Sequence, residues 1–208
     1  MKNKKRIYVP MAVDILHTGH LNIIEVARNL GDVTIGLLTD EAIVNYKRLP
    51  MLEFEERKRI VENIKGVKLI VTQDTYDYEP ILRKLKPDYL VHGDDWKTGF
   101  QSRMREKILK LLNEWGGELI EPEYTRGISS TALIDELTKN GVTADTRRKS
   151  FNRLLTVKPI VRILEAHTGL TGLIAEKTHI EKDGRRHELD GIWESSLTDS
   201  TSKGKPDT

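Results

Sequence analysis

The chain has 208 residues, of which 38% are hydrophobic and 32% charged, and 34 Lys and Arg residues against 32 Asp and Glu residues give a formal net charge of +2. This length suits one good-sized domain, or one domain and part of another, and the balanced charge argues against a dedicated nucleic-acid-binding protein. The absence of cysteine excludes disulfides and thiolate metal sites. No apolar run approaches the ~20 residues of a membrane helix and no signal peptide is evident, so we expect a soluble cytoplasmic protein without membrane contact.

Five strands and five helices are predicted to alternate over residues 6–141. The strands are expected at residues 7–13, 32–38, 67–71, 89–92 and 118–120, and the helices at 21–30, 54–64, 78–85, 103–115 and 130–140. The strands are short β-branched apolar runs, and glycines or a proline end most of the helices. This alternation predicts an α/β fold with a doubly wound, five-stranded parallel sheet, in which ligands bind at the carboxyl ends of the strands.

The chain changes character after this first domain, which is predicted over residues 1–141. Residues 142–158 are polar and basic, and we interpret them as a linker. Residues 159–208 form a separate segment, in which residues 160–166 resume an apolar pattern and residues 189–193 resemble one more strand.

Two histidines flank a glycine just after the first predicted strand, in His17-Thr18-Gly19-His20. The start of a helix presents free N–H groups and a partial positive charge, which suit a phosphate. Both imidazoles can donate hydrogen bonds to phosphoryl oxygens, Gly19 allows close approach of the backbone, and Asp14 could orient the loop or a histidine. Structural histidines and a zinc site are the alternatives, although no third zinc ligand is evident.

A second loop precedes the last predicted helix. It contains Arg126, Gly127, Ile128, Ser129, Ser130 and Thr131. A glycine followed by hydroxyl side chains offers capping groups and backbone donors at a helix start, so the loop either caps the helix only or binds phosphate. Because this turn and the first one both follow strands of one sheet, their helix starts can face each other and cradle a triphosphate.

Charged residues also follow the other strands. Gly93-Asp94-Asp95-Trp96 suits ribose hydroxyls, a base or Mg²⁺, or else forms a turn with a packed tryptophan. The loop over residues 45–50 carries Lys47 and Arg48, which would neutralise charge on phosphates or form a solvated pair. Arg57 could point back to the same site.

Taken together, HTGH at 17–20, HGDDW at 92–96 and RGISST at 126–131 resemble the cytidylyltransferase superfamily, and especially its glycerol-3-phosphate cytidylyltransferase branch. The resemblance covers residues 6–138 and implies a Rossmann-like fold, CTP as co-substrate and Mg²⁺. It implies that the catalytic residues are His17, His20, Lys47 and Arg126. It further implies that the nucleotide-binding residues are Met11, Asp14, Gly19, Asp94, Trp96, Gly127, Ile128, Ser129, Ser130 and Thr131.

This sequence departs from the family pattern in two places. Met11-Ala12-Val13-Asp14 stands where the family often has Gly-Thr-Phe-Asp, so only the aspartate is kept. The arginine that usually precedes the second signature is replaced by Tyr124, and we expect Arg126 to take over its charge.

The last segment resembles the beginning of phosphoenolpyruvate mutase, in EAHTGL at 165–170 and GIWESSL at 191–197. A (β/α)₈ barrel needs ~250 residues, so we expect an incomplete, poorly packed, barrel-derived tail without mutase activity. Because the mutase makes a C–P compound, the fusion implies that CMP is transferred to 2-hydroxyethylphosphonate or 2-aminoethylphosphonate.

The predicted reaction is an in-line attack by a phosphonate or phosphate oxygen on the α-phosphorus of CTP, with release of pyrophosphate and no covalent enzyme intermediate. One alternative is a cytidylyl- or adenylyltransferase that acts on a small phosphate ester such as glycerol-3-phosphate. Another is a non-catalytic nucleotide-binding module of a phosphoenolpyruvate mutase. Because members of the family are commonly dimers, a homodimer is expected.

Overall fold

The computed structural model describes residues 4–97, 101–123, 125, 127–139, 143–182 and 185–194. It divides into two compact units, residues 1–150 and residues 151–208. The candidate functional residues predicted from the sequence all fall within the first unit.

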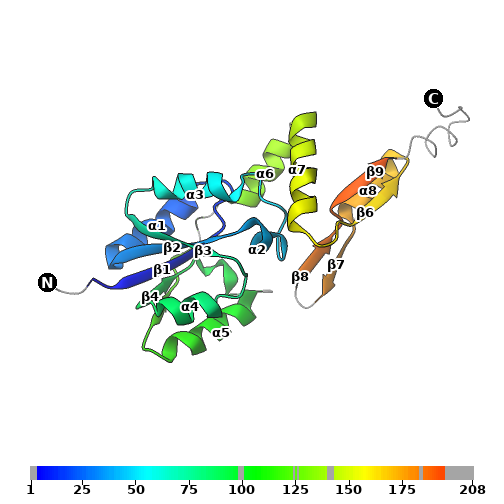
Figure 1. The fold of residues 1–208 in the computed structure, drawn as a ribbon. Coiled ribbons are helices and arrows are strands. Elements are labelled where there is room, and N and C mark those ends of the chain that lie inside the picture. Colours follow the sequence, from blue (N-terminus) through cyan, green and yellow to red (C-terminus); the bar gives the residue numbers. More distant parts are fainter. Residues whose placement is uncertain are drawn as a thin grey trace, which may run out of the picture. The chain divides into compact units, whose positions relative to one another are not determined.

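A five-stranded parallel sheet runs through the first unit, in the order β3-β2-β1-β4-β5 (Figure 1). Its strands are β1 (Arg6–Met11), β2 (Asp32–Leu38), β3 (Val67–Gln73), β4 (Tyr89–Val91) and β5 (Glu118–Ile120). All four neighbouring pairs are parallel. The chain first builds outward from β1 to β3, and then continues on the other side of β1 with β4 and β5. The doubly wound sheet is thus confirmed, and its strand order reverses between β1 and β4, where such sheets bind their ligands.

Helices cover both faces of this sheet (Figure 1). The helices α1 (Thr18–Leu30) and α3 (Phe54–Glu62) cover one face, and α4 (Glu79–Leu85) and α5 (Ser102–Asn113) cover the other. The unit also contains α2 (Asp40–Val44), α6 (Ser130–Lys139) and a 3₁₀ turn, η1 (Asp94–Trp96), after β4. Side chains alternate between the two faces along β1, so Val9 joins the core under α1 and α3, while Tyr8 joins the core under α4 and α5. Both side chains are fully buried.

The helix after the first strand starts earlier than the sequence pattern predicted. It begins at Thr18 rather than at residue 21, so His20 lies in its first turn. The predicted pattern also lacked α2, whose five residues are too few to show a helical period. Thr39 starts this short helix, because its side chain accepts a hydrogen bond from the N–H of Ala42 at 3.2 Å.

The segment interpreted as a linker contains a helix, α7 (Ala144–Val157), and the boundary between the two units falls within it. The second unit contains β6 (Ile163–Ala166), α8 (Gly169–Lys177), β7 (His179–Lys182), β8 (Arg185–Glu188) and β9 (Gly191–Glu194). Strands β6 and β9 pair in parallel, and β7 and β8 pair antiparallel, as separate two-stranded sheets.

The second unit has very little core. Among its described residues, the buried hydrophobic side chains are those of Ala166 and Ala175 alone, whereas Leu170 is 68% exposed and Trp193 is 64% exposed. Two pairs of strands and one short helix cannot enclose an apolar interior. The prediction of a poorly packed tail is therefore confirmed for the part of the tail that the structure describes.

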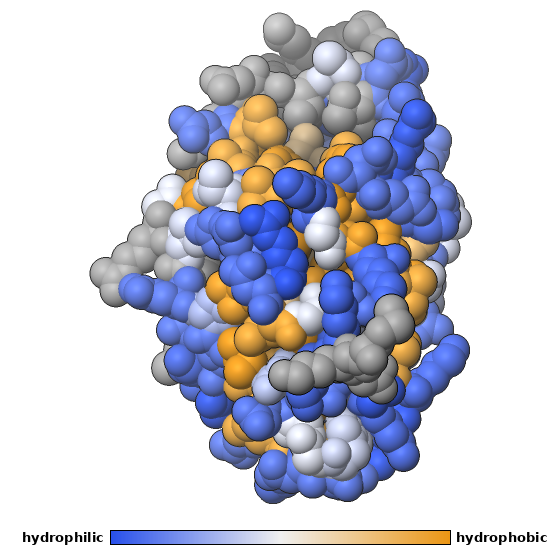
Figure 2. All heavy atoms as spheres, turned by 90° about the vertical axis from the view of Figure 1, so that its left-hand side faces the viewer, coloured by the Kyte–Doolittle hydropathy of each residue, from blue (hydrophilic) through white to orange (hydrophobic). Residues whose placement is uncertain are grey.

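Figure 2 shows hydrophilic residues over most of the face that it draws, with hydrophobic residues exposed between them. Within the described ranges, none of the helices combines the length and the apolar character that crossing a bilayer requires.

Candidate active site

The turn between β1 and α1 holds the two predicted histidines in a reciprocal cap. His17 has an extended backbone (φ −140°, ψ 171°) and starts the helix, and the N–H of Gly19 donates to its Nδ1 at 3.1 Å. In return, the N–H of His17 donates to Nδ1 of His20 at 3.3 Å. The two ring centroids are 4.0 Å apart, with planes inclined by 44°. The backbone at the helix start therefore fixes both imidazoles side by side.

These hydrogen bonds define the tautomer of both rings. A backbone N–H can only donate, so both Nδ1 atoms accept, and the proton of each neutral ring lies on Nε2. Burial and the positive charge of Lys47 lower the pKa of His17. Burial, His17 and Lys47 lower the pKa of His20 to about 3. At neutral pH both rings are neutral, and each carries one N–H donor on the edge that is not engaged by the backbone.

Gly19 is required by the His17 ring itself. A Cβ atom at this position would lie 2.9 Å from both Cε1 and Nδ1 of His17, which is closer than side chains pack. The expected reason for this glycine was close approach of the backbone to a ligand. The structure adds that the imidazole of His17 lies over the glycine.

The second predicted loop lies against this turn. The side-chain amide of Asn22 in α1 donates to Oγ1 of Thr125 at 3.0 Å, and Oγ of Ser130 donates to the carbonyl of Ile15 at 3.3 Å. Ser129 caps α6, because its Oγ accepts from the N–H of Ala132 at 3.1 Å. The predicted meeting of two helix starts at one sheet edge is confirmed for these residues.

The remaining residues of this loop have different positions. Gly127 has a positive φ of 82°, which glycine adopts without strain. Ile128 is half-buried and Thr131 is exposed. The predicted catalytic Arg126 lies outside the described residues, as does Tyr124.

Asp14 anchors the loop that carries Lys47. It is 7% exposed, and its Oδ1 accepts the N–H groups of Met51 at 2.7 Å and Leu52 at 3.2 Å. Protein atoms around the Lys47 ammonium partly desolvate it, which lowers its pKa, while Asp14 and Asp95 act in the opposite direction. Since the charge of Lys47 also depresses the pKa of both histidines, the ammonium lies within electrostatic reach of the histidine turn.

Arg57 holds two strand ends together behind the site. Its guanidinium is fully buried, and its Nη1 donates to the carbonyls of Ala12 at 2.5 Å and Leu38 at 2.8 Å. Its Nη2 pairs with Asp40 at 2.6 Å. These contacts link the segments that follow β1 and β2. The sequence suggested that Arg57 could reach the site, and the structure shows that it supports the site from behind.

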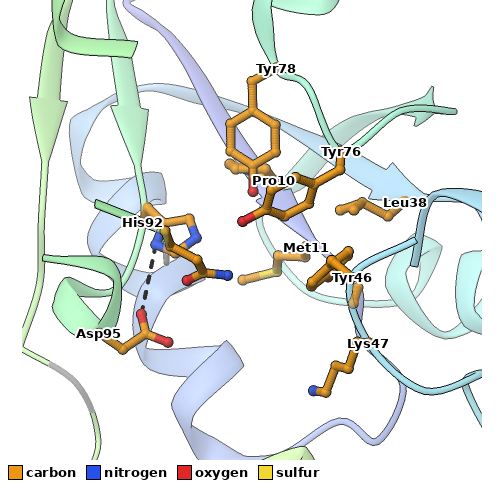
Figure 3. Close-up of a pocket in the computed structure, with 11 residues that line it drawn as sticks. Pro10, Met11, Leu38, Tyr46, Lys47, Tyr76, Tyr78, His92 and Asp95 are labelled. Carbon is orange, nitrogen blue, oxygen red and sulfur yellow. Dashed lines mark ion pairs between the residues drawn. The ribbon is translucent and has the colours of Figure 1, made fainter. Parts of the chain in front are cut away.

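A pocket of about 340 Å³ opens at the carboxyl ends of the strands (Figure 3). It is lined by Pro10, Met11, Ala12, Leu38, Tyr46, Lys47, Tyr76, Tyr78, His92, Asp95 and Gln101. Met11 and Lys47 were predicted at the site. Asp95 belongs to the stretch Gly93-Asp94-Asp95-Trp96 that was also predicted there, and His92 to the HGDDW motif, although no role was given to it. The three tyrosines were not predicted, because an aromatic residue after a strand has the same sequence signal whether it fills a core or faces a pocket.

Of the predicted stretch Gly93-Asp94-Asp95-Trp96 after β4, Asp95 is the residue that lines the pocket. Trp96 is only 1% exposed, donates from Nε1 to Glu121 at 2.7 Å, and stacks on His92 with centroids 3.8 Å apart. Trp96 therefore supports the pocket wall from behind, through His92, and its predicted position near the nucleoside stays a prediction. Asp95 lines the pocket, whereas Asp94 lies 3.5 Å from the ammonium of Lys97.

The described side chains of the site fit a metal ion with few protein ligands. Among the described residues, no group of three His, Asp or Glu side chains is placed to hold a metal. Mg²⁺ commonly uses one or two carboxylates together with substrate phosphates and water, and Asp95 supplies a carboxylate at the pocket. In this part of the chain the two histidines of the turn have no third ligand for zinc.

The doubly wound parallel sheet, with a helix start at the point where its strand order reverses, is the architecture of the Rossmann-like α/β fold. The chain belongs to the cytidylyltransferase-like family, which matches residues 12–136. A solved structure of similar fold, the lipopolysaccharide core biosynthesis protein from Thermoplasma volcanium GSS1, superposes with a TM-score of 0.50 at 19% identity, over 59% of this chain and 98% of that one.

Curated relatives carry several activities in their names. The ethanolamine-phosphate cytidylyltransferase of Dictyostelium discoideum is 33% identical over 65% of this chain and 38% of its own length. The bifunctional protein HldE of Desulfatibacillum aliphaticivorans is 28% identical over 67% of this chain and 28% of its own. The FAD synthase of Ferroglobus placidus is 33% identical over 51% of this chain and 69% of its own. The chain thus spans about a third of the length of the first two relatives.

Proposed function

We propose that this protein transfers CMP from CTP to an oxygen of a small phosphonate, 2-hydroxyethylphosphonate or 2-aminoethylphosphonate, and releases pyrophosphate. The observation that carries the proposal is the pair of Nε2–H donors at the start of α1 beside the pocket. Two neutral imidazoles held by backbone hydrogen bonds can bind phosphoryl oxygens without reorganising.

The chemistry we infer is a direct displacement. An oxygen of the acceptor attacks the α-phosphorus of CTP, a new P–O bond forms, and the bond to the β-phosphate oxygen breaks, so that pyrophosphate carries the leaving electron pair. His17 and His20 donate to oxygens of the transferring group, and Lys47 offsets its negative charge. Arg126 has the same role in the proposal. Catalysis then comes from positioning and charge stabilisation.

Mg²⁺ is part of the proposal as an ion bound mainly by the nucleotide phosphates. When bound, it neutralises charge on the triphosphate. Asp95 is the pocket carboxylate that would contact it, since Asp14 is already engaged with the backbone of the Lys47 loop.

CTP is proposed as the nucleotide because of the family and of the ethanolamine-phosphate cytidylyltransferase relatives. One relative is named an FAD synthase instead, so the choice between CTP and ATP needs a direct test. Pyrophosphate release from the four common nucleoside triphosphates, each with the same mixture of acceptors, makes that choice. We expect release from CTP to exceed release from each of the others.

The phosphonate acceptor is inferred from the resemblance of residues 159–208 to the start of a mutase that makes a C–P compound. A small phosphate ester is the second candidate, favoured by the ethanolamine-phosphate cytidylyltransferases among the relatives. Matched pairs separate the two, since 2-aminoethylphosphonate and phosphoethanolamine differ by one bridging oxygen. Mass detection of CMP adducts should show more adduct with the phosphonate of each pair. A preference for the ester would show that the acceptor is a phosphate ester, while the proposed reaction would still be CMP transfer from CTP.

A further inference from the structure

His92 carries its proton on the opposite nitrogen from the two histidines of the turn. Its Nδ1 lies 2.8 Å from the carbonyl oxygen of Gly93. A carbonyl can only accept, so Nδ1 carries the proton and Nε2 of the neutral ring presents a lone pair. His17 and His20 offer hydrogen-bond donors, whereas His92 offers an acceptor.

The His92 ring is held rigidly at the pocket wall. It stacks on Trp96 with planes inclined by 11°, and the indole is itself fixed by the hydrogen bond of its Nε1 to Glu121. The His92 side chain is 17% exposed and lines the pocket. Within the part of the chain that the structure describes, no hydrogen bond engages its Nε2. The lone pair is therefore available to a ligand.

Burial keeps this ring neutral. Desolvation lowers the pKa of His92, although its hydrogen bond to Gly93 and the charges of Asp95 and Glu121 oppose the effect. The 3.8 Å approach of Nδ1 to Asp95, dashed in Figure 3, is therefore a contact between a carboxylate and a neutral ring at neutral pH.

The two sides of the pocket have complementary polarity. Figure 3 shows His92 and Asp95 on one side and Lys47 on the other. One side thus accepts hydrogen bonds and carries negative charge, while the other carries positive charge. A small molecule with an anionic group at one end and a protic group at the other matches this arrangement.

We propose that His92 determines acceptor specificity, because its Nε2 accepts a hydrogen bond from a hydroxyl or ammonium at the non-reacting end of the acceptor. This inference rests on the proposed function. A site built to pair with a protic group rejects an analogue without one, since the buried polar atom would be left unpaired. The shared chemistry is the N–H or O–H donor.

Three acceptors of nearly equal size test the proposal: 2-aminoethylphosphonate, 2-hydroxyethylphosphonate and ethylphosphonate, which lacks the donor. In kcat/KM, we expect the unmodified protein to prefer the two protic acceptors by about a hundredfold. His92→Phe keeps the stack on Trp96 and removes the lone pair, so this preference should fall to roughly threefold or less, mainly through KM. His92→Gln retains an acceptor oxygen and should restore part of the preference.

If His92→Phe remains folded in a thermal melt and discriminates as the unmodified protein does, His92 is not the determinant. The same holds if His92→Gln behaves like His92→Phe.

Binding measurements separate failure of this inference from failure of the proposed function. If the unmodified protein transfers CMP to none of the three compounds, the proposed function fails. Calorimetric titration of the three phosphonates into the unmodified and His92→Phe proteins then decides the role of His92. Tighter binding of the protic compounds that is lost in the variant supports the inference, and equal binding or no binding of all three by the unmodified protein overturns it.

Discussion

The two histidines of the turn act as donors because of what their other ring nitrogens do. Each Nδ1 accepts a backbone N–H at the start of α1, so in the proposed reaction the same helix start would bind a phosphate and orient the imidazoles toward it. Such donors lose little entropy when the substrate arrives. His92 shows the reverse arrangement, with Nδ1 donating to a carbonyl. Backbone groups thus assign different roles to three chemically identical rings.

Gly19 offers a test of this geometry without removing a functional group. In Gly19→Ala the new methyl group would lie 2.9 Å from the His17 ring, which must then move. Displacement of a positioning group by about 1 Å costs on the order of a hundredfold in rate, so we expect kcat to fall about that far in the CMP-transfer assay. Gly172→Ala is the matched control, because a Cβ there meets nothing within 4 Å. Equal rates for the two variants would contradict the packing role of Gly19.

The depressed pKa of His20 predicts an acid-sensitive fold. The pKa is about 3 in the folded protein and about 6.5 for an unperturbed histidine. Between these values the unfolded chain binds a proton that the folded chain does not, so His20 lowers the free energy of unfolding as the pH falls through this window. The slope approaches about 1.4 kcal/mol per pH unit.

His20→Gln cannot titrate and should lose this contribution. Urea unfolding at pH 7 and pH 5 measures it, and we expect the unmodified protein to lose more stability than the variant between the two conditions. The free energy of unfolding of the variant should still fall with pH, although less steeply, because His17 and His92 also have lowered pKa values. Parallel losses in both proteins would show that His20 is not buried as a neutral ring.

At the scale of elements, the site depends on connections between strand ends. Asp14 holds the Lys47 loop through two backbone N–H groups, and Arg57 joins the carbonyls of Ala12 and Leu38. The buried pair of Arg57 and Asp40 lies beneath these segments. The ends of β1 and β2 are thus held in a fixed relation, with the histidine turn following β1 and the short helix α2 following β2.

Arg57→Met should destabilise the fold strongly. It removes the Arg57 charge beside the buried carboxylate of Asp40 and the hydrogen bonds to three carbonyls, a kind of change that costs about 3–5 kcal/mol. Arg83→Met is the control, since Arg83 is exposed and its pairs with Glu79 and Glu114 belong to a class that contributes about 0–1 kcal/mol. Denaturant unfolding measures both variants. A loss below about 1 kcal/mol for Arg57→Met would contradict its structural role.

The sequence pattern was sufficient for the central sheet, because the continuous apolar run of β1 reflects burial on both faces of the sheet, and the helical spacing in α3 reflects burial on one side. It misplaced the start of α1, because the cap there is a histidine, whereas Ser, Thr, Asp and Asn are the usual caps. The residue types themselves predicted the histidine turn and Lys47. Neither signal could assign His92 to the pocket and Trp96 to the core, since two aromatic residues so close in the sequence differ only in the direction in which the backbone points them.

At the scale of the molecule, the two units differ in how well they bury their apolar residues. The first unit encloses cores on both faces of its sheet, while the second exposes Leu170, Ile180 and Trp193. Every described residue of the pocket and of the histidine turn belongs to the first unit. Transfer activity and exposed apolar surface are therefore expected to reside in different parts of the chain.

Truncation after residue 158 tests this division and leaves α7 intact. We expect the shortened chain to keep CMP-transfer activity, and to bind less of a dye that reports exposed apolar surface. Activity and dye binding of the shortened chain are each compared with those of the full chain at equal protein concentration. If activity disappears while circular dichroism still shows a folded protein, the second unit contributes to the reaction.

The central claim is that the histidine turn catalyses transfer of CMP to an acceptor. The most direct measurement quantifies pyrophosphate and CMP adduct together, by mass spectrometry, after reaction of CTP with 2-hydroxyethylphosphonate and 2-aminoethylphosphonate. We predict one pyrophosphate for each adduct, and a loss of about a hundredfold or more in both products for His17→Ala, with only modestly weaker CTP binding. Tight CTP binding without either product, or His17→Ala activity within about twofold of the unmodified protein, would contradict the account.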